Sequence, residues 1–146
     1  NFDMKYTADD GKEHRPAVLH VAIFGSVERF MGILIEHFAG AFPTWLAPEQ
    51  VRLLPVADPH MKYATALYEK MRAAGVRVTL ADSGESLGKR IRHAEMMKVP
   101  YMLVLGDEEI KGKSVAVRDF KTKKQTTAKA DAFLKKVLKE VEERSL

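Results

Sequence analysis

Two patterns of apolar and polar residues follow each other along the chain, and the change between them falls near residue 48. Beyond it, short apolar or alternating runs typical of strands cover 51–56, 76–80, 101–105 and 115–118. Apolar residues at helical spacing cover 60–75, 85–98 and the tail from about Thr127. Strands that alternate with helices predict an α/β domain over residues 49–146, in which helices cover both faces of a small mixed or parallel sheet.

The first 48 residues predict a smaller structure. Apolar runs at Phe2–Tyr6 and Ala17–Ile23 are typical of strands, and residues 26–39 have the spacing of an amphipathic helix. Two strands and one helix bury little surface by themselves. We therefore expect residues 1–48 to be a remnant of a larger antiparallel domain, and the chain to be a piece of a longer polypeptide.

The composition sets few limits on function. Hydrophobic residues make up 46% of the 146 residues, and the net charge of +4 is compatible with nucleic-acid binding. Because the chain has no cysteine, disulfides and thiolate metal sites are excluded. No apolar run has the length of a membrane span and the N-terminus is too polar for a signal peptide, so we expect a cytoplasmic protein without a membrane partner.

A possible phosphate site lies at the start of the first predicted helix. Gly25 lets the backbone approach a ligand closely, and Ser26 can cap the helix. The free N–H groups of a helix start attract anions, and Arg29 adds a planar donor with two prongs. The same letters also fit an ordinary strand–turn–helix with a solvated arginine.

The predicted helix at 85–98 has one basic face. Its basic side chains are Lys89, Arg90, Arg92, His93 and, just beyond, Lys98. Leu87, Ile91 and Ala94 repeat at helical spacing, so they would face the core and leave the basic residues outward. Such a face can bind RNA phosphates, and it can equally be a solvated surface.

Four blocks of the sequence resemble the threonyl-tRNA synthetase family of class II. They are HVAIFGSVERFMGILIEHFAG, FPTWLAPEQVRLLPV, ESLGKRIRHAEMMKVPYMLVLGDEE and VAVR. The resemblance implies that 1–48 is the end of a catalytic domain with the third class II motif and that 49–146 is an anticodon-binding domain. It also implies a homodimeric parent enzyme that attaches threonine to tRNA with ATP.

The resemblance assigns roles near the N-terminus. Arg29 would bind an ATP phosphate during catalysis, with Gly25 and Ser26 lining the same pocket. His20 would be one of three protein ligands to a zinc ion that recognises threonine, but its two partners would lie outside this chain. Zinc and Mg-ATP are therefore expected in the parent enzyme, and this fragment alone is expected to hold neither and to be inactive.

The resemblance also assigns an anticodon-reading surface to Arg92, Lys98, Glu109 and Arg118. Glu109 can accept hydrogen bonds from a base edge, and Arg118 can donate two to a base or hold a phosphate. Anticodon loops are single-stranded, so their base edges are accessible to side chains. In threonine tRNAs the constant anticodon letters are the second and third, G and U.

This chain departs from the family pattern at three places. Val21 stands where an arginine is common, Gly84 stands where the family often has an asparagine that contacts the anticodon, and Asp119-Phe120 replaces a usual arginine after Arg118. The last two departures make base specificity less secure than general RNA affinity.

Three alternatives remain open. The chain could belong to a prolyl-, glycyl- or histidyl-tRNA synthetase, or to a non-catalytic accessory protein that reuses the domain to bind RNA or protein. An unrelated small-ligand binder is the third alternative, although neither GxGxxG nor GxxxxGK[ST] occurs.

Overall fold

The computed structural model describes residues 3–146, so Phe2 of the first predicted strand lies outside the described residues. The chain separates into two compact units, one ending at Ile33 and the other covering Leu34–Leu146. None of the described helices is long and apolar enough to cross a membrane.

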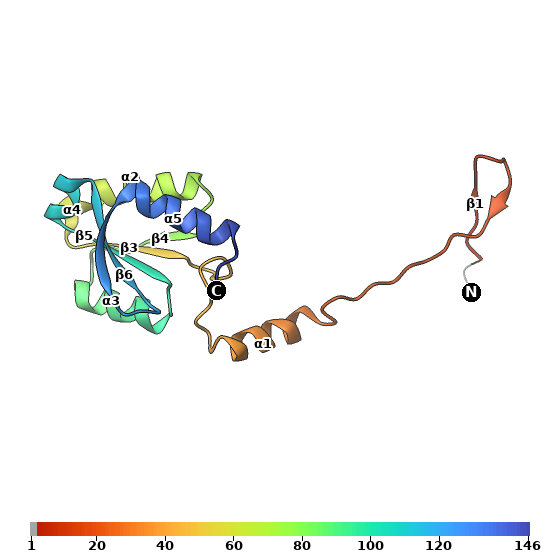
Figure 1. Ribbon diagram of the computed structural model, residues 1–146, viewed down its shortest axis with the longest axis horizontal. Coiled ribbons are helices and arrows are strands. Elements are labelled where there is room, and N and C mark those ends of the chain that lie inside the picture. Colours follow the sequence, from red (N-terminus) through yellow and green to blue (C-terminus); the bar gives the residue numbers. More distant parts are fainter. Residues whose placement is uncertain (1–2) are drawn as a thin grey trace. The chain divides into compact units, whose positions relative to one another are not determined.

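The larger unit is built on a five-stranded sheet with the strand order β4-β3-β5-β6-β7 (Figure 1). The strands are β3 (Val51–Pro55), β4 (Val78–Leu80), β5 (Tyr101–Leu105), β6 (Ser114–Asp119) and β7 (Gln125–Lys129). β3 pairs in parallel with both β4 and β5, whereas β6 runs antiparallel to β5 and to β7. The sheet is therefore mixed, as the sequence predicts.

Helices cover both faces of this sheet, which confirms the predicted α/β architecture (Figure 1). The helices are α2 (Met61–Ala73), which follows the short 3-10 helix η1 (Asp58–His60), and α3 (Leu87–Met96), α4 (Asp107–Gly112) and α5 (Ala130–Glu142). α2 and α5 pack on one face through Leu67, Met71 and Phe133, and α3 packs on the other through Ala94. β5 is apolar without interruption because its side chains enter both cores.

The segment before β3 is fixed to the larger unit by hydrogen bonds. Gln50 is fully buried, and its amide donates to the Thr44 carbonyl at 2.9 Å and accepts from the Arg77 N–H at 2.9 Å. The Arg77 guanidinium in turn donates to the carbonyls of Ala47 at 2.8 Å and Trp45 at 2.7 Å. We call residues 44–50 the strap, because these contacts hold it against the start of the sheet.

The sequence did not predict two elements of the larger unit, α4 and β7. α4 has only six residues, too few to show helical periodicity. β7 is an exposed edge strand with the polar sequence QTTAK, and it includes Thr127, where the sequence predicted the start of the last helix. That helix begins at Ala130 instead.

The predicted strand at Ala17–Ile23 is wrong in this structure. The smaller unit has a short hairpin of β1 (Tyr6–Thr7) and β2 (Glu13–His14), and residues 15–22 have no regular structure. Leu19 is 89% exposed and Ile23 is 80% exposed. An alternating apolar run becomes a strand only beside a partner strand, and residues 3–33 provide none for it.

A candidate nucleic-acid interface

Helix α3 positions the first of the predicted RNA-binding residues. Arg92 is exposed on its outer face, whereas Ala94 is buried against the sheet, as the periodicity predicts. The outward placement of Arg90 is wrong. Arg90 is only 6% exposed, and its guanidinium donates to the Pro55 carbonyl at 2.7 Å and to the Val56 carbonyl at 3.4 Å. Arg90 therefore ties α3 to the carboxyl end of β3.

A second buried arginine was missed by the sequence analysis. Arg52 lies on β3, binds Glu49 through two donors at 2.7 and 2.5 Å, and approaches Nδ1 of His93 on α3 with Nη1 at 2.9 Å. Because a guanidinium only donates, Nδ1 accepts this hydrogen bond and carries no proton. The available signal was a single arginine inside the apolar run VRLLPV.

Arg118 lies on β6 opposite Met102, on the face of the sheet that α3 covers. One of its terminal nitrogens is 3.3 Å from Oε1 of Glu95 on α3, and both side chains are 36% exposed. A single contact of this length leaves most of the five guanidinium donors available to a ligand.

Lys98 follows α3 and has a left-handed backbone with φ 55°. Its ammonium group donates to the carbonyl of Ala39, in the turn that follows helix α1 (Val27–His37). Cations near the C-terminus of a helix are stabilised by its free carbonyls. Lys98 therefore has an internal partner as well as donors for RNA.

Glu109 lies in the first turn of α4. Its Oε2 accepts the backbone N–H of Gly106 at 3.0 Å and thereby caps the helix. Oε1 has no hydrogen-bond partner among residues 3–146, so one acceptor points to solvent or ligand.

The four predicted residues do not all lie at the same end of the strands. Because β6 is antiparallel to β5, Arg118 lies near the beginning of β5, and Lys98 precedes the same end of that strand. Glu109 follows the end of β5 and lies at the opposite edge. Arg118 and Lys98 thus lie at the same end of the strands, which we call the basic edge, and Glu109 lies at the other end.

The carboxyl ends of the parallel strands are joined by polar contacts between loops. His60 is 6% exposed, accepts the Ala57 N–H at Nδ1 at 2.9 Å, and places Nε2 3.1 Å from Asp107. The proton of the neutral ring is therefore on Nε2, which donates to Asp107. Near this edge, Gly84 stands in a turn in which its N–H donates to Asp82 at 3.0 Å.

Two cavities open on the larger unit. The smaller, of about 410 Å³, lies beside α3 and β4 and has both cationic and acidic walls, including Arg52, Arg90, Asp82 and Glu85. Its two arginines already have partners inside the protein, Arg52 with Glu49 and His93, and Arg90 with the carbonyls of Pro55 and Val56.

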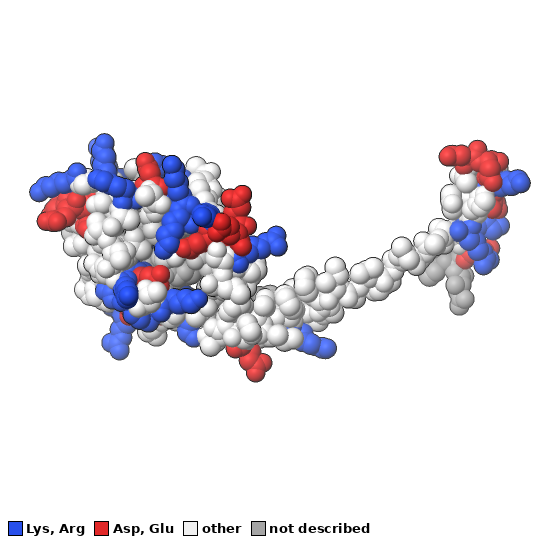
Figure 2. All heavy atoms as spheres, viewed as in Figure 1, with Lys and Arg blue, Asp and Glu red and all other residues white. Residues whose placement is uncertain are grey.

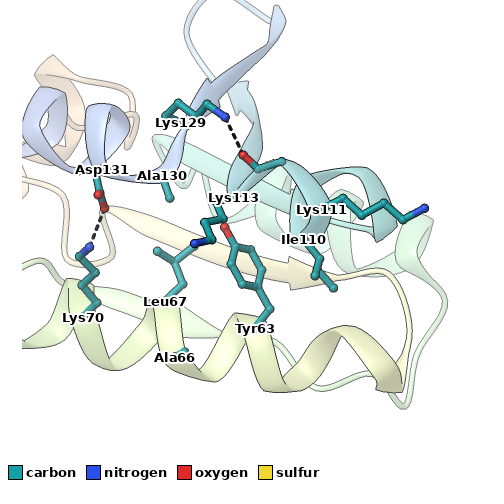
Figure 3. A pocket seen from close by; sticks show the side chains of 11 residues that line it. Tyr63, Ala66, Leu67, Lys70, Ile110, Lys111, Lys113, Lys129, Ala130 and Asp131 are labelled. Atoms are coloured by element: carbon teal, nitrogen blue, oxygen red, sulfur yellow. Dashed lines mark hydrogen bonds and ion pairs between the residues drawn. The ribbon is translucent and has the colours of Figure 1, made fainter.

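The larger cavity, of about 760 Å³, lies between α2, α4 and the start of α5 and contains none of the four predicted residues (Figure 3). Most of its lysines either have a partner within the protein or point away from the cavity. Lys70 pairs with Asp131 at 2.6 Å, Lys129 donates to the Gly112 carbonyl at 2.7 Å, and Lys111 points away from the cavity (Figure 3). Lys70 also holds the pKa of Asp131 below its usual value.

The smaller unit contains the predicted phosphate site. Gly25 has φ 65°, and Ser26 Oγ accepts the N–H of Arg29 at 3.4 Å as it donates to Glu28 at 2.7 Å. The Ser26 contact lowers the pKa of Glu28. The Arg29 side chain is exposed and has no hydrogen-bond partner within residues 3–146.

His20, the predicted zinc ligand, lies in the smaller unit. His20 is exposed, and in the part of the chain that the structure describes no three His, Asp or Glu side chains are grouped to hold a metal ion. One imidazole falls short of the three or four ligands that a protein zinc site requires.

Known proteins resemble this chain in sequence. Residues 50–140 match the sequence profile of the family described as "Anticodon binding domain". The chain is 47% identical over 145 residues to a threonine–tRNA ligase of Caldanaerobacter subterraneus subsp. tengcongensis, with 99% of this chain and 22% of that protein aligned. It is 53% identical over 117 residues to the threonine–tRNA ligase of Carboxydothermus hydrogenoformans, with 80% of this chain and 18% of that protein aligned. The chain thus spans about a fifth of the length of these relatives.

Solved structures give the same result. The RNA-binding domain of threonyl-tRNA synthetase from Cryptosporidium parvum Iowa II superposes with a TM-score of 0.76 at 31% identity, covering 94% of this chain and 35% of that chain. Prolyl-tRNA synthetase from Cryptosporidium parvum, 23% identical with a TM-score of 0.67, shares the fold over 79% of this chain and 26% of its own. The chain therefore belongs to the anticodon-binding domain family, and its similarity to threonine–tRNA ligases extends over nearly its whole length.

Proposed function

We propose that this chain binds threonine tRNA through the anticodon loop, as the anticodon-binding part of a threonine–tRNA ligase. The family match over residues 50–140 carries the proposal. Further support comes from the basic edge with Arg118 and Lys98, and from the exposed side chain of Arg92 on α3. Arg118 would donate to a base edge or a phosphate, and Glu109 would accept from a base from the opposite edge of the sheet.

The parent protein is proposed to be the whole ligase, a cytoplasmic homodimer that attaches threonine to tRNA with ATP. There Arg29, with Gly25 and Ser26, would hold an ATP phosphate, and His20 would supply one zinc ligand, while the remaining groups would come from other parts of the protein. Catalysis requires such groups to be positioned together. This piece alone is therefore proposed to be inactive, which an assay of threonine activation with ATP would test.

The test of RNA binding compares a threonine tRNA transcript with the same transcript mutated at the second and third anticodon letters, each at two salt concentrations. We expect a preference for the native anticodon that survives the higher salt. Equal binding of both transcripts that collapses steeply with salt would reduce the function to phosphate attraction.

The matched variants are Arg118→Ala and Arg72→Ala. Arg72 is exposed and lies on α2, on the opposite face of the sheet, so it controls for loss of one positive charge. Arg118→Ala is expected to weaken binding about tenfold or more, in line with about 1–3 kcal/mol for a two-donor arginine contact, whereas Arg72→Ala should have little effect. An equal loss in both variants would contradict a specific role for Arg118.

A further inference from the structure

The turn between β6 and β7 is a short basic segment with three lysines in four residues. It reads FKTKK at residues 120–124. Lys121, Lys123 and Lys124 are exposed, and no ion pair joins any of them to another residue within 3–146. The ammonium group of Lys123 lies 3.6 Å from the centre of the Phe120 ring, in a cation–π contact.

This turn has a defined conformation. Asp119 accepts the Thr122 N–H on its carboxylate at 2.8 Å and the Lys123 N–H on its carbonyl at 3.0 Å. Lys123 has φ 58°, a left-handed conformation that is costly for a residue with a side chain. The backbone that carries the lysines is thus a hydrogen-bonded turn.

The turn also extends the basic edge. Arg118 on β6 and Gln125 on β7 are paired in the sheet where the turn begins and ends. The Phe120 N–H donates to the carbonyl of Pro100, two residues beyond Lys98, at 2.9 Å. Phe120 is itself only partly buried. The aromatic ring of Phe120 and the three lysines of the turn, none of which forms an ion pair within residues 3–146, therefore follow Arg118 directly along the chain.

We propose that Phe120 stacks against an unpaired base of the bound RNA while the lysines of the turn contact the flanking phosphates. The proposal rests on the function proposed above. Lys123 is exposed, so its cation–π contact with the Phe120 ring is weak. A base can therefore take the place of the ammonium group on the ring, and Lys123 can then contact a phosphate. An RNA loop supplies both flat bases and phosphates, whereas an acidic peptide supplies only the charge.

The experiment uses the full chain and a threonine tRNA anticodon stem–loop that carries the fluorescent base 2-aminopurine at one loop position at a time. Stacking on an aromatic ring quenches this base, so we expect quenching at one position on binding. Phe120→Leu should abolish the quenching and weaken binding about tenfold, within the range of base–aromatic stacking. Phe120→Tyr, which keeps the ring, should preserve both.

A triple variant tests the lysines separately. Replacing Lys121, Lys123 and Lys124 with alanine should reduce the slope of log affinity against log salt by about 2, since each phosphate contact to a single strand contributes roughly 0.7. Thermal unfolding of every variant checks that the fold is retained. The RNA affinities of Phe120→Leu and Phe120→Tyr are compared at equal folded fraction.

The outcomes separate this inference from the proposed function. If Arg118→Ala weakens binding but Phe120→Leu binds and quenches as the unmodified chain does, the stacking contact is refuted and tRNA binding stands. If the unmodified chain binds no tRNA, both proposals fall. Binding of the triple variant with an unchanged salt slope would refute the phosphate contacts alone.

Discussion

Glu109 shows how one carboxylate can combine a structural and a recognition role. Oε2 fixes the beginning of α4 through the Gly106 N–H, whereas Oε1 has no partner within the described part of the chain. A glycine at 106 suits this cap, because a side chain there would come within 3.2 Å of Oε2. The cap therefore holds the free oxygen at a fixed place.

At this residue the prediction concerns specificity. Glu109→Gln keeps one oxygen that can accept the Gly106 N–H, but it replaces the free oxygen with an NH2 group, which donates and cannot accept a hydrogen bond from a base. We expect affinity for the native anticodon to fall about tenfold and affinity for a mutated anticodon to stay the same. Glu108→Gln, at an exposed neighbouring position, is the control. A parallel fall for both RNAs would show that Glu109 does not read a base.

Among the elements, the strap before β3 is held by a polar network as well as by Gln50. Glu140 on α5 accepts from the Thr44 hydroxyl at 2.9 Å and from the Tyr101 hydroxyl at 2.9 and 3.0 Å. Lys136 stands 3.6 Å from the same carboxylate. Glu140 on α5 therefore binds both the strap, through Thr44, and the sheet, through Tyr101.

Tyr101→Phe tests this network. Loss of the hydroxyl should lower the free energy of unfolding by about 1–2 kcal/mol at pH 7, measured by urea denaturation. Burial, the largest cause, raises the pKa of Tyr101 above its ordinary 10.0. A raised pKa in the folded state gives stability that is present below pH 10 and lost as the pH rises through the folded value. The variant should thus lose less stability above pH 10 than the unmodified chain, and equal losses would contradict the role of this hydroxyl.

Elements were predictable where burial imposed a periodic pattern. β5 and α3 followed from their apolar residues because each packs against a core. The polar edge strand β7 had no such pattern, and Ala17–Ile23 had the pattern without the neighbouring strand it requires. Arg90 was misplaced because its partners are the carbonyls of Pro55 and Val56, which helical spacing does not reveal.

For the whole molecule, the contacts of the strap decide where the independently folding domain begins. The two-domain division at residue 48 stays a prediction. The strap contributes to the larger unit through Thr44, Trp45 and Ala47, all before that point. A domain cut at residue 50 would lose these contacts.

Two shortened chains test this point. Residues 50–146 should be less stable than residues 41–146 by about 3 kcal/mol, since three or more hydrogen bonds of about 1 kcal/mol each are lost. Chemical denaturation measures the difference, and both chains should retain the same helical circular dichroism at low denaturant. Equal midpoints would place the folding boundary at residue 50 and make the strap a passive connection.

The uncharged segment 16–27 has a consequence for the lifetime of the protein in the cell. Figure 2 shows it as a stretch without acidic or basic side chains, and Leu19 and Ile23 within it are almost fully exposed. Extended apolar chain is what chaperones bind and proteases cut. A partner surface that covered this segment would also protect it, so the same exposed apolar residues would mark for removal any molecule that lacked such a cover.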